Sequence, residues 1–219
     1  MKKLVLSIFF LLGLVTNSYA TGSLGFTVSG ADIKSVVKDD IDNNGSTDTT
    51  KNIANDVTFA SVFFEKAIND FISVGVDFIP GTAEFESRST SQSSIKEKGS
   101  STTTGTNKGN VDVSRHFTLY AQPQKEIVGG LKVFGTVGLI RADAESTLQS
   151  ISSTNKDVTE TLEGVKLGLG LKKETGFGFV RLEYSETDYD EISATTTNST
   201  KITADIDTEI LALSVAKSF

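Results

Sequence analysis

Apolar residues recur at every second position in several short segments of this chain. Residues 165–171 read VKLGLGL, so four apolar side chains share one face while Lys and Gly occupy the other. The same period of two appears in residues 71–80, 115–122, 178–186 and 209–219. Because successive side chains of a strand point to opposite faces, this period predicts five β-strands, each with one apolar face.

Three further segments are rich in Phe, Val and Thr, although their two faces are mixed. They are residues 23–32, 55–65 and 131–147. We interpret them as strands from their β-branched and aromatic content, which brings the predicted number to eight. After the first 20 residues the sequence has no apolar run of 18 or more, so it predicts no transmembrane helix.

The connections between the predicted strands alternate in length. Long polar connections follow the odd-numbered strands, at residues 33–55, 87–109, 149–159 and 188–204, and short ones follow the even-numbered strands, at residues 65–70, 123–130 and 172–176. In an antiparallel meander this alternation places all long connections at one end and all tight turns at the other. The Ser- and Thr-rich segment 87–109 is either a solvated loop or a hairpin that continues its two flanking strands.

The N-terminus has the pattern of a secretory signal peptide. Lys2 and Lys3 precede an apolar run of about a dozen residues, and Ser18 and Ala20 stand at the small positions before a cleavage site. We therefore predict a signal peptide over residues 1–20 and one domain over residues 21–219.

Charge and cysteine content exclude several classes of function. Acidic residues outnumber basic ones, 28 to 21, which disfavours binding to nucleic acid through a basic face. The chain has no cysteine, so disulfides, thiolate metal sites and cysteine catalysis are excluded.

The signal peptide, the eight strands, the alternating connections and the apolar alternation that ends on Phe219 occur together. With Leu211, Leu213 and Val215, Phe219 resembles the C-terminal signature of Gram-negative outer-membrane β-barrels. The whole chain resembles the small eight-stranded barrels of the OmpA transmembrane-domain and opacity type. The resemblance implies an all-β, antiparallel, up-and-down transmembrane barrel whose last strand is read by the outer-membrane insertion machinery. It also implies a location in the outer membrane, with the lipid bilayer and lipopolysaccharide as partners.

A barrel of this type pairs every backbone polar group within the sheet, so one apolar face per strand is enough to span lipid. The aromatic residues that remain for the two membrane interfaces are Tyr120, Tyr184 and Tyr189, with Phe85, Phe117, Phe177 and Phe179 as possible substitutes.

Five ionisable residues lie on the polar faces of their predicted strands, namely Asp77, His116, Lys166, Arg181 and Glu183. In a barrel these side chains point into the lumen. An isolated buried charge is very costly, so we expect the charged groups to pair with one another. Eight strands leave a lumen that side chains can fill, and we therefore predict a plugged interior.

The first long connection contains the spacing of a calcium loop. Asp40, Asp42, Asn44 and Asp48 fall at positions 1, 3, 5 and 9, and Gly45 falls at position 6. Such spacing directs carboxylate and amide oxygens to one hard cation. Position 12, usually a bidentate Glu, is Lys51. The alternative is an acidic, solvated turn, and we predict no other cofactor.

Ser114 and His116 are two positions apart and are expected on the same strand face, which suggests a Ser/His catalytic pair. Strand neighbours at this spacing are too far apart for a short hydrogen bond, and no third member is evident. We therefore predict that the protein is not an enzyme.

The function that follows is a membrane scaffold that presents four polar loops outside the cell, to a ligand that the sequence does not identify. Two alternatives remain at this point. One is a small-solute pore through the charged lumen, and the other is a soluble, lipocalin-like periplasmic carrier whose apolar faces point inward.

Overall fold

The computed structural model describes residues 22–40, 44–96, 102–149, 156–195 and 201–219, so the predicted signal peptide lies outside the described residues. All regular elements in these ranges are strands: β1 (Gly22–Asp40), β2 (Thr49–Asn69), β3 (Ile72–Lys96), β4 (Thr102–Val128), β5 (Leu131–Gln149), β6 (Lys156–Glu174), β7 (Gly178–Tyr189), β8 (Ile192–Thr195) and β9 (Lys201–Ser218). No helix within these ranges is long and apolar enough to cross a membrane.

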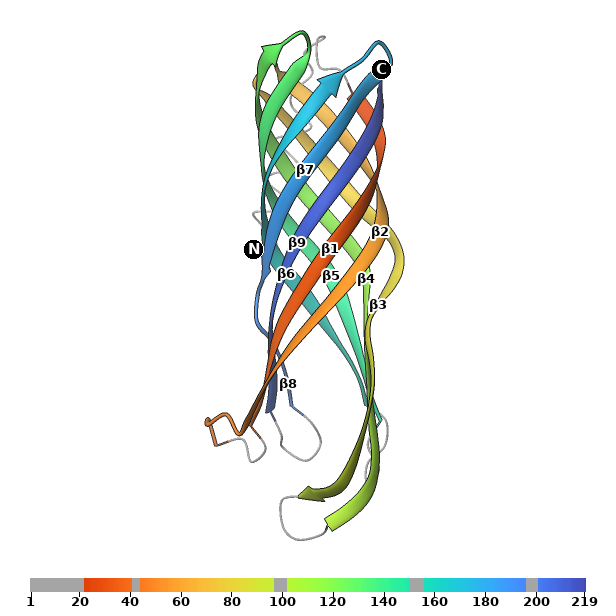
Figure 1. The fold of residues 1–219 in the computed structure, drawn as a ribbon, viewed down its shortest axis with the longest axis vertical. Helices are drawn as coiled ribbons and strands as arrows, with labels where there is room; N and C mark the ends of the chain where they lie inside the picture. Colours follow the sequence, from red (N-terminus) through yellow and green to blue (C-terminus); the bar gives the residue numbers. More distant parts are fainter. Residues whose placement is uncertain (1–21, 41–43, 97–101, 150–155, 196–200) are drawn as a thin grey trace.

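The strands form one closed antiparallel ring (Figure 1). Each strand from β1 to β6 pairs with the next, β7 pairs with β9, and β9 pairs with β1. The short β8 continues β7, because its pairing with β9 resumes at Ile192 and Ala204, displaced by one residue from the last β7 pair, Asp188 and Asp207. The ring therefore has eight strands, and the predicted up-and-down barrel is confirmed.

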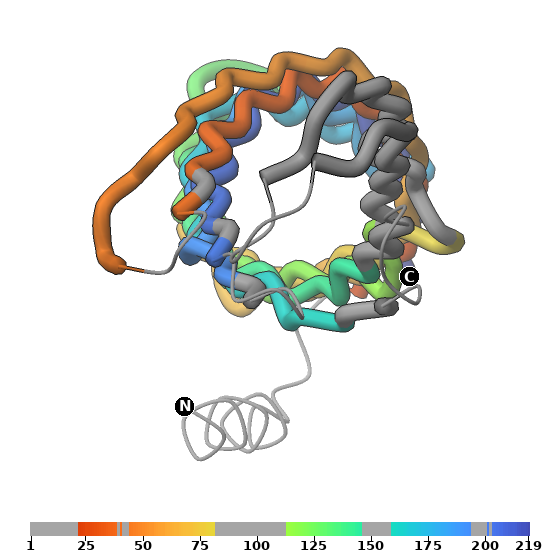
Figure 2. Tube along the Cα trace, turned by 90° about the horizontal axis from the view of Figure 1, so that it is seen from below, coloured from red at the N-terminus to blue at the C-terminus, as the bar shows by residue number. Residues whose placement is uncertain are grey.

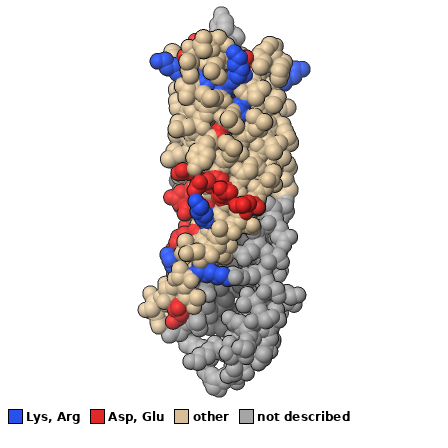
Figure 3. All heavy atoms as spheres, in the orientation of Figure 1, with Lys and Arg blue, Asp and Glu red and all other residues tan. Residues whose placement is uncertain are grey.

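The apolar strand faces point outward. Leu169 is 70% exposed and Leu213 is 53% exposed, and the same holds for the apolar positions along most strands of the ring. Figure 3 shows the result as a broad band with few charges, bounded at both ends by charged side chains. Hydrocarbon suits such a surface and water does not. The lipocalin-like alternative is wrong, because it required these side chains inside.

Tight turns connect the strands at one end of the barrel. Gly129 and Gly130 form a two-residue turn between β4 and β5, and both have positive φ, as the type I′ hairpin turn requires. The first and last described residues meet at the same end, where the N–H of Phe219 donates to the carbonyl of Gly22 over 2.9 Å.

The strands extend much further at the opposite end than the sequence predicted. The β1–β2 ladder continues to Asp39 and Thr49, and the β3–β4 ladder continues to Lys96 and Thr102. The predicted extents of the long loops are therefore wrong, and segment 87–109 belongs largely to a hairpin. In the sequence these extensions show no sustained alternation of apolar and polar residues, so periodicity did not reveal them.

The outer ends of the strands separate into two four-stranded ladders. β2 pairs with β3 only from Val62 and Phe78 toward the tight turn, and the β6–β7 ladder ends at Gly164 and Tyr189. Beyond these points β8, β9, β1 and β2 form one ladder, and β3 to β6 form the other. We call them the two limbs; Figure 1 shows them diverging, and Figure 2 shows the ring of strands in end view.

Some of the predicted aromatic interface residues are exposed, as Tyr184 is, and others are not. Tyr120 and Phe179 are buried in the lumen, because they lie on the polar faces of their strands. At the tight-turn end Phe71 and Phe219 are 66% and 73% exposed, and Phe177, which was predicted, is exposed beside them. Phenylalanine therefore supplies the aromatic residues at this boundary of the apolar band.

Candidate functional site in the barrel lumen

The inward faces of the strands carry polar, charged and aromatic side chains. Nearest the tight turns, Glu65 of β2 is almost fully buried and bonds two cations. Its Oε1 lies 2.5 Å from Lys172 Nζ, and its Oε2 lies 2.9 Å from Arg181 Nη1. Tyr120 Oη donates to the same Oε2 over 3.3 Å. One carboxylate thus links β2, β4, β6 and β7 across the lumen.

Two glutamines add hydrogen bonds to these cations, although the buried Arg181 Nε has no hydrogen-bond partner among the described residues. Arg181 Nη1 donates to Gln122 Oε1 over 3.2 Å, and Lys172 Nζ donates to Gln124 Oε1 over 3.1 Å. Buried charges are tolerated when their hydrogen-bonding capacity is used in this way. The two glutamines and the Glu65 ion pairs form what we call the charged layer.

Aromatic rings enclose the charged layer. Lys172 Nζ lies 4.7 Å from the ring centroid of Phe179, and Arg181 Cζ lies 4.6 Å from that of Phe63. The rings of Phe63 and Phe134 are almost fully buried. Cation–π contacts of this kind strengthen when water is excluded, so the rings both stabilise the cations and fill the lumen.

A second ion pair borders the charged layer on its outer side. Lys166 Nζ lies 2.7 Å from Glu183 Oε1, and Arg181 Nε lies 3.9 Å from Glu183 Oε2. The structure thus brings together three of the five predicted lumen residues. The other two bond elsewhere: Ser61 Oγ donates to Asp77 Oδ2 over 2.8 Å, and His116 Nε2 lies 3.2 Å from Tyr189 Oη.

Sequence reasoning missed Glu65 and Lys172. Lys172 continues the even-numbered inward positions of β6, directly after the alternating segment 165–171, so extending that alternation by one residue would have found it. Glu65 ends a segment in which Phe63 and Phe64 obscure the period. No sequence signal indicated that these two residues meet.

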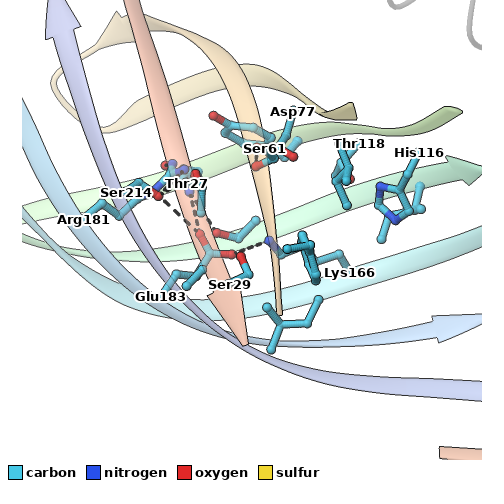
Figure 4. Close-up of a pocket in the computed structure, with 18 residues that line it drawn as sticks. Thr27, Ser29, Ser61, Asp77, His116, Thr118, Lys166, Arg181, Glu183 and Ser214 are labelled. Atoms are coloured by element: carbon cyan, nitrogen blue, oxygen red, sulfur yellow. Dashed lines mark hydrogen bonds and ion pairs between the residues drawn. The ribbon is translucent and has the colours of Figure 1, made fainter. Parts of the chain in front are cut away.

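A small cavity with a mixed polar and apolar lining lies beside the charged layer (Figure 4). It offers about 50 Å³ to the centres of water-sized molecules, which is room for a few waters. Its lining combines hydroxyl and charged groups with apolar side chains on the outer side, among them Ser29, Ser61, Asp77, His116, Lys166 and Ile140. Positive and negative groups are balanced in this lining, so the cavity favours neutral polar occupants over ions.

An apolar cluster crosses the lumen further out. Ile33, Ala142, Leu162 and Ile206 are buried together, and they come from β1, β5, β6 and β9. Val57 and Val113 pack against them from β2 and β4. The charged layer and this apolar cluster therefore occupy the lumen on either side of the cavity.

Ser114 and His116 form no pair in the structure, in line with the spacing argument. The register of β4 shifts between Ser114 and Phe117, and Arg115 between them has a φ of 51°. Before the shift Ser114 pairs with Asp143, which alternates with the inward-facing Ala142, so Ser114 faces outward while His116 faces the lumen. The expectation of one shared face is wrong, because a bulge inverts the alternation between the two residues.

The predicted calcium loop is described only in part, since Asp42 lies outside the described residues. The carboxylate of Asp40 accepts hydrogen bonds from the backbone N–H groups of Asn44 and Gly45, over 3.0 and 2.8 Å. Asp48 is exposed. No group of three or more potential metal ligands occurs in the described part of the chain. The calcium site stays a prediction, and the observed bonds of Asp40 are those of a turn.

The predicted insertion residues lie along the exterior of β9. Leu211, Leu213 and Val215 are exposed in the apolar band, and the ring of Phe219 lies 6.4 Å from that of Phe64. Their recognition by insertion machinery stays a prediction.

No protein-family model matches the sequence, and no curated protein matches it. Several solved structures are similar. Ail, the attachment invasion locus protein of Yersinia pestis, in complex with the heparin analogue sucrose octasulfate, is 13% identical over 87% of this chain and 98% of its own, with a TM-score of 0.38. Neisserial surface protein A is 12% identical over 89% and 97%, with a TM-score of 0.42. Outer membrane protease OmpT from Escherichia coli is 8% identical over 93% and 98%, with a TM-score of 0.45.

These TM-scores are below 0.5, so the class of the protein follows from its own features. In the closed antiparallel ring, the backbone N–H and C=O groups are paired between neighbouring strands. The apolar band faces outward, and charged groups lie mainly in the lumen and at the two ends. Only a barrel of this kind crosses a bilayer with strands. The chain is a transmembrane β-barrel protein.

Proposed function

We propose that the barrel is closed to solutes and acts as an anchor, which presents the two limbs outside the cell for contact with partners. The observation that carries this proposal is the contrast between a filled lumen and long external strands. The charged layer and the apolar cluster occupy the lumen, whereas the β1–β2 and β3–β4 ladders continue well beyond the apolar band. The proposal includes no catalytic activity, since the only histidine contacts Tyr189 rather than a nucleophile.

Conductance distinguishes this proposal from the pore alternative. Purified protein inserted in a planar lipid bilayer should give no current steps, because ions would have to cross a layer in which Glu65 is bonded to two cations. A known porin inserted in the same bilayer serves as the positive control. Reproducible steps whose size changes in Lys166→Ala would overturn the closed barrel and establish the pore.

Cysteine labelling tests the orientation of the limbs. The chain has no cysteine, so single substitutions give clean signals. Thr47→Cys lies in the exposed connection between β1 and β2, and Gly176→Cys lies in the exposed turn between β6 and β7. A membrane-impermeant maleimide should label the first on intact cells and the second only after the outer membrane is opened. The reverse pattern would contradict the proposal.

A further inference from the structure

The limbs leave an edge of β2 open. β2 pairs with β3 only between Val62 and Asn69, whereas its pairing with β1 continues to Thr49. In the ladders that the described residues form, residues 56–61 therefore pair with β1 alone. An edge strand directs alternate N–H and C=O groups away from its neighbour, which is the template that a further strand recognises.

The position of this edge increases its tendency to take a partner. Val62 and Phe78, the last pair of the β2–β3 ladder, are both well exposed on the barrel exterior, so the ladder ends within the apolar band. The first residues of the open edge therefore lie at the border between lipid and water, where an unpaired backbone group is costly. Lysine and proline commonly protect exposed edges, and residues 56–61 contain neither.

A row of carboxylates ends at this edge. Glu186, Glu209, Asp32 and Asp56 lie directly opposite one another in register across β7, β9, β1 and β2. All four lie on the exterior, where Figure 3 shows acidic side chains gathered below the apolar band. We call them the acidic row. Lys34 forms an ion pair with Glu209, whereas Asp32 and Asp56 form none with the described residues.

Like charges directly opposite one another destabilise a sheet, and opposite charges stabilise it. A strand added to the open edge would place one of its side chains opposite Asp56. Lys or Arg at that position would extend the acidic row with a compensating charge. A second copy of this chain is a poorer occupant, because its own edge carries Asp56 and no basic residue over residues 56–61.

We propose that residues 56–61 of β2 bind an extended basic segment of another protein as an added strand, with a Lys or Arg opposite Asp56. This inference rests on the proposed function and names the chemical class of the partner. Six residues match the usual length of a strand, so the edge can hold such a segment along its whole length.

Peptide binding to the full barrel in detergent micelles tests the inference. The probe is a fluorescent seven-residue peptide that alternates Val and Lys, and its counterpart carries Glu in place of Lys. We expect the Lys peptide to bind and the Glu peptide not to bind. Asp56→Lys should weaken binding of the Lys peptide about tenfold, since one attractive cross-strand pair is replaced by repulsion. Asp188→Lys on β7 makes the same change of charge away from the edge and should leave binding within about twofold.

Hydrogen exchange of the backbone amides identifies the site. In the free protein, about half of the amides in residues 56–61 should exchange quickly, because only alternate groups bond to β1. The Lys peptide should slow these amides, while residues 28–33 of β1, paired on both sides, should stay slow throughout.

Four results would overturn strand addition: no binding of the Lys peptide, equal weakening in both charge variants, no protection of residues 56–61, or protection that rises with protein concentration without peptide. The last would identify a second copy as the occupant. None of them would affect the closed barrel, which is tested by conductance and labelling.

Discussion

The strands of this barrel are paired differently toward its two ends. We call the part nearest the tight turns the inner half and the part that carries the limbs the outer half. In the inner half every strand is paired on both sides, and the lumen is filled by the charged layer and its aromatic rings. In the outer half the ring divides into two limbs, β2 has an open edge, and carboxylates lie side by side on the exterior.

The difference follows from the surroundings of each half. Hydrocarbon offers the backbone no hydrogen bonds, so a strand inside the bilayer needs a partner on both sides. Water offers those bonds beyond the membrane, so an open edge costs less there than at the border of the lipid. The ring therefore has to be closed only where lipid surrounds it. Beyond the lipid, the strands can leave backbone groups open for contact with partners.

The largest expected effect comes from removing the carboxylate at the centre of the inner half. Glu65→Ala leaves Lys172 and Arg181 buried without their shared anion, and breaking such a pair costs about 3–5 kcal/mol. Urea unfolding in micelles, followed by the shift between folded and unfolded bands on a gel, measures this loss. Glu209→Ala removes the carboxylate of the exposed pair with Lys34 and should change stability little. If both substitutions lowered the free energy of unfolding equally, the buried ion pairs of Glu65 would contribute no more to stability than the exposed pair of Glu209.

An intermediate effect is expected from a single methyl group on β1. A Cβ at Gly25 would overlap the buried ring of Phe63 and lie 2.8 Å from the carbonyl oxygen of Val215. Gly25→Ala should therefore destabilise the barrel by about 1–3 kcal/mol, through overpacking.

Gly30→Ala, five residues further along the same strand, is the matched control. A Cβ there meets nothing within 4 Å. The same urea titration should show no loss of stability in this variant, and a loss as large as that of Gly25→Ala would argue against a tightly filled lumen.

The smallest effect should be a gain of stability in the outer half. Asp32 lies between Asp56 and Glu209 in the acidic row, so Asp32→Asn removes two unfavourable neighbours. We expect a stabilisation of about 0.2–1 kcal/mol at low salt. The gain should disappear near 1 M salt, because the screening length then falls to about 3 Å. A gain that persists at high salt would point to a cause other than charge.

The sequence predicted the features that depend on local alternation. Five of the strands, their outward faces and the inward positions of Lys166, Arg181 and Glu183 follow from a period of two, and the other three strands follow from their β-branched and aromatic content. The bulge at Arg115 was missed because an arginine gives no sequence signal for a change of register. One inserted residue is enough to exchange the two faces of a strand.

The features that depend on pairing between distant segments could not be predicted. The β2–β3 ladder ends at Val62 although both strands continue, and nothing in either segment alone indicates where two strands part. The bonds of Glu65 likewise join residues separated by more than 100 positions.

The short β2–β3 ladder also has a mechanical consequence. Every other pair of neighbouring strands in the ring shares a longer ladder. The β1–β2 ladder includes β1 residues from Gly22 to Asp39, whereas the β2–β3 ladder includes only β2 residues from Val62 to Asn69. Tension applied to the two limbs would act mainly on the hydrogen bonds of this short ladder, because it begins where the limbs separate. When the two limbs are pulled apart, the β2–β3 hydrogen bonds should break first. The other strand pairs should then remain as one open, curved sheet.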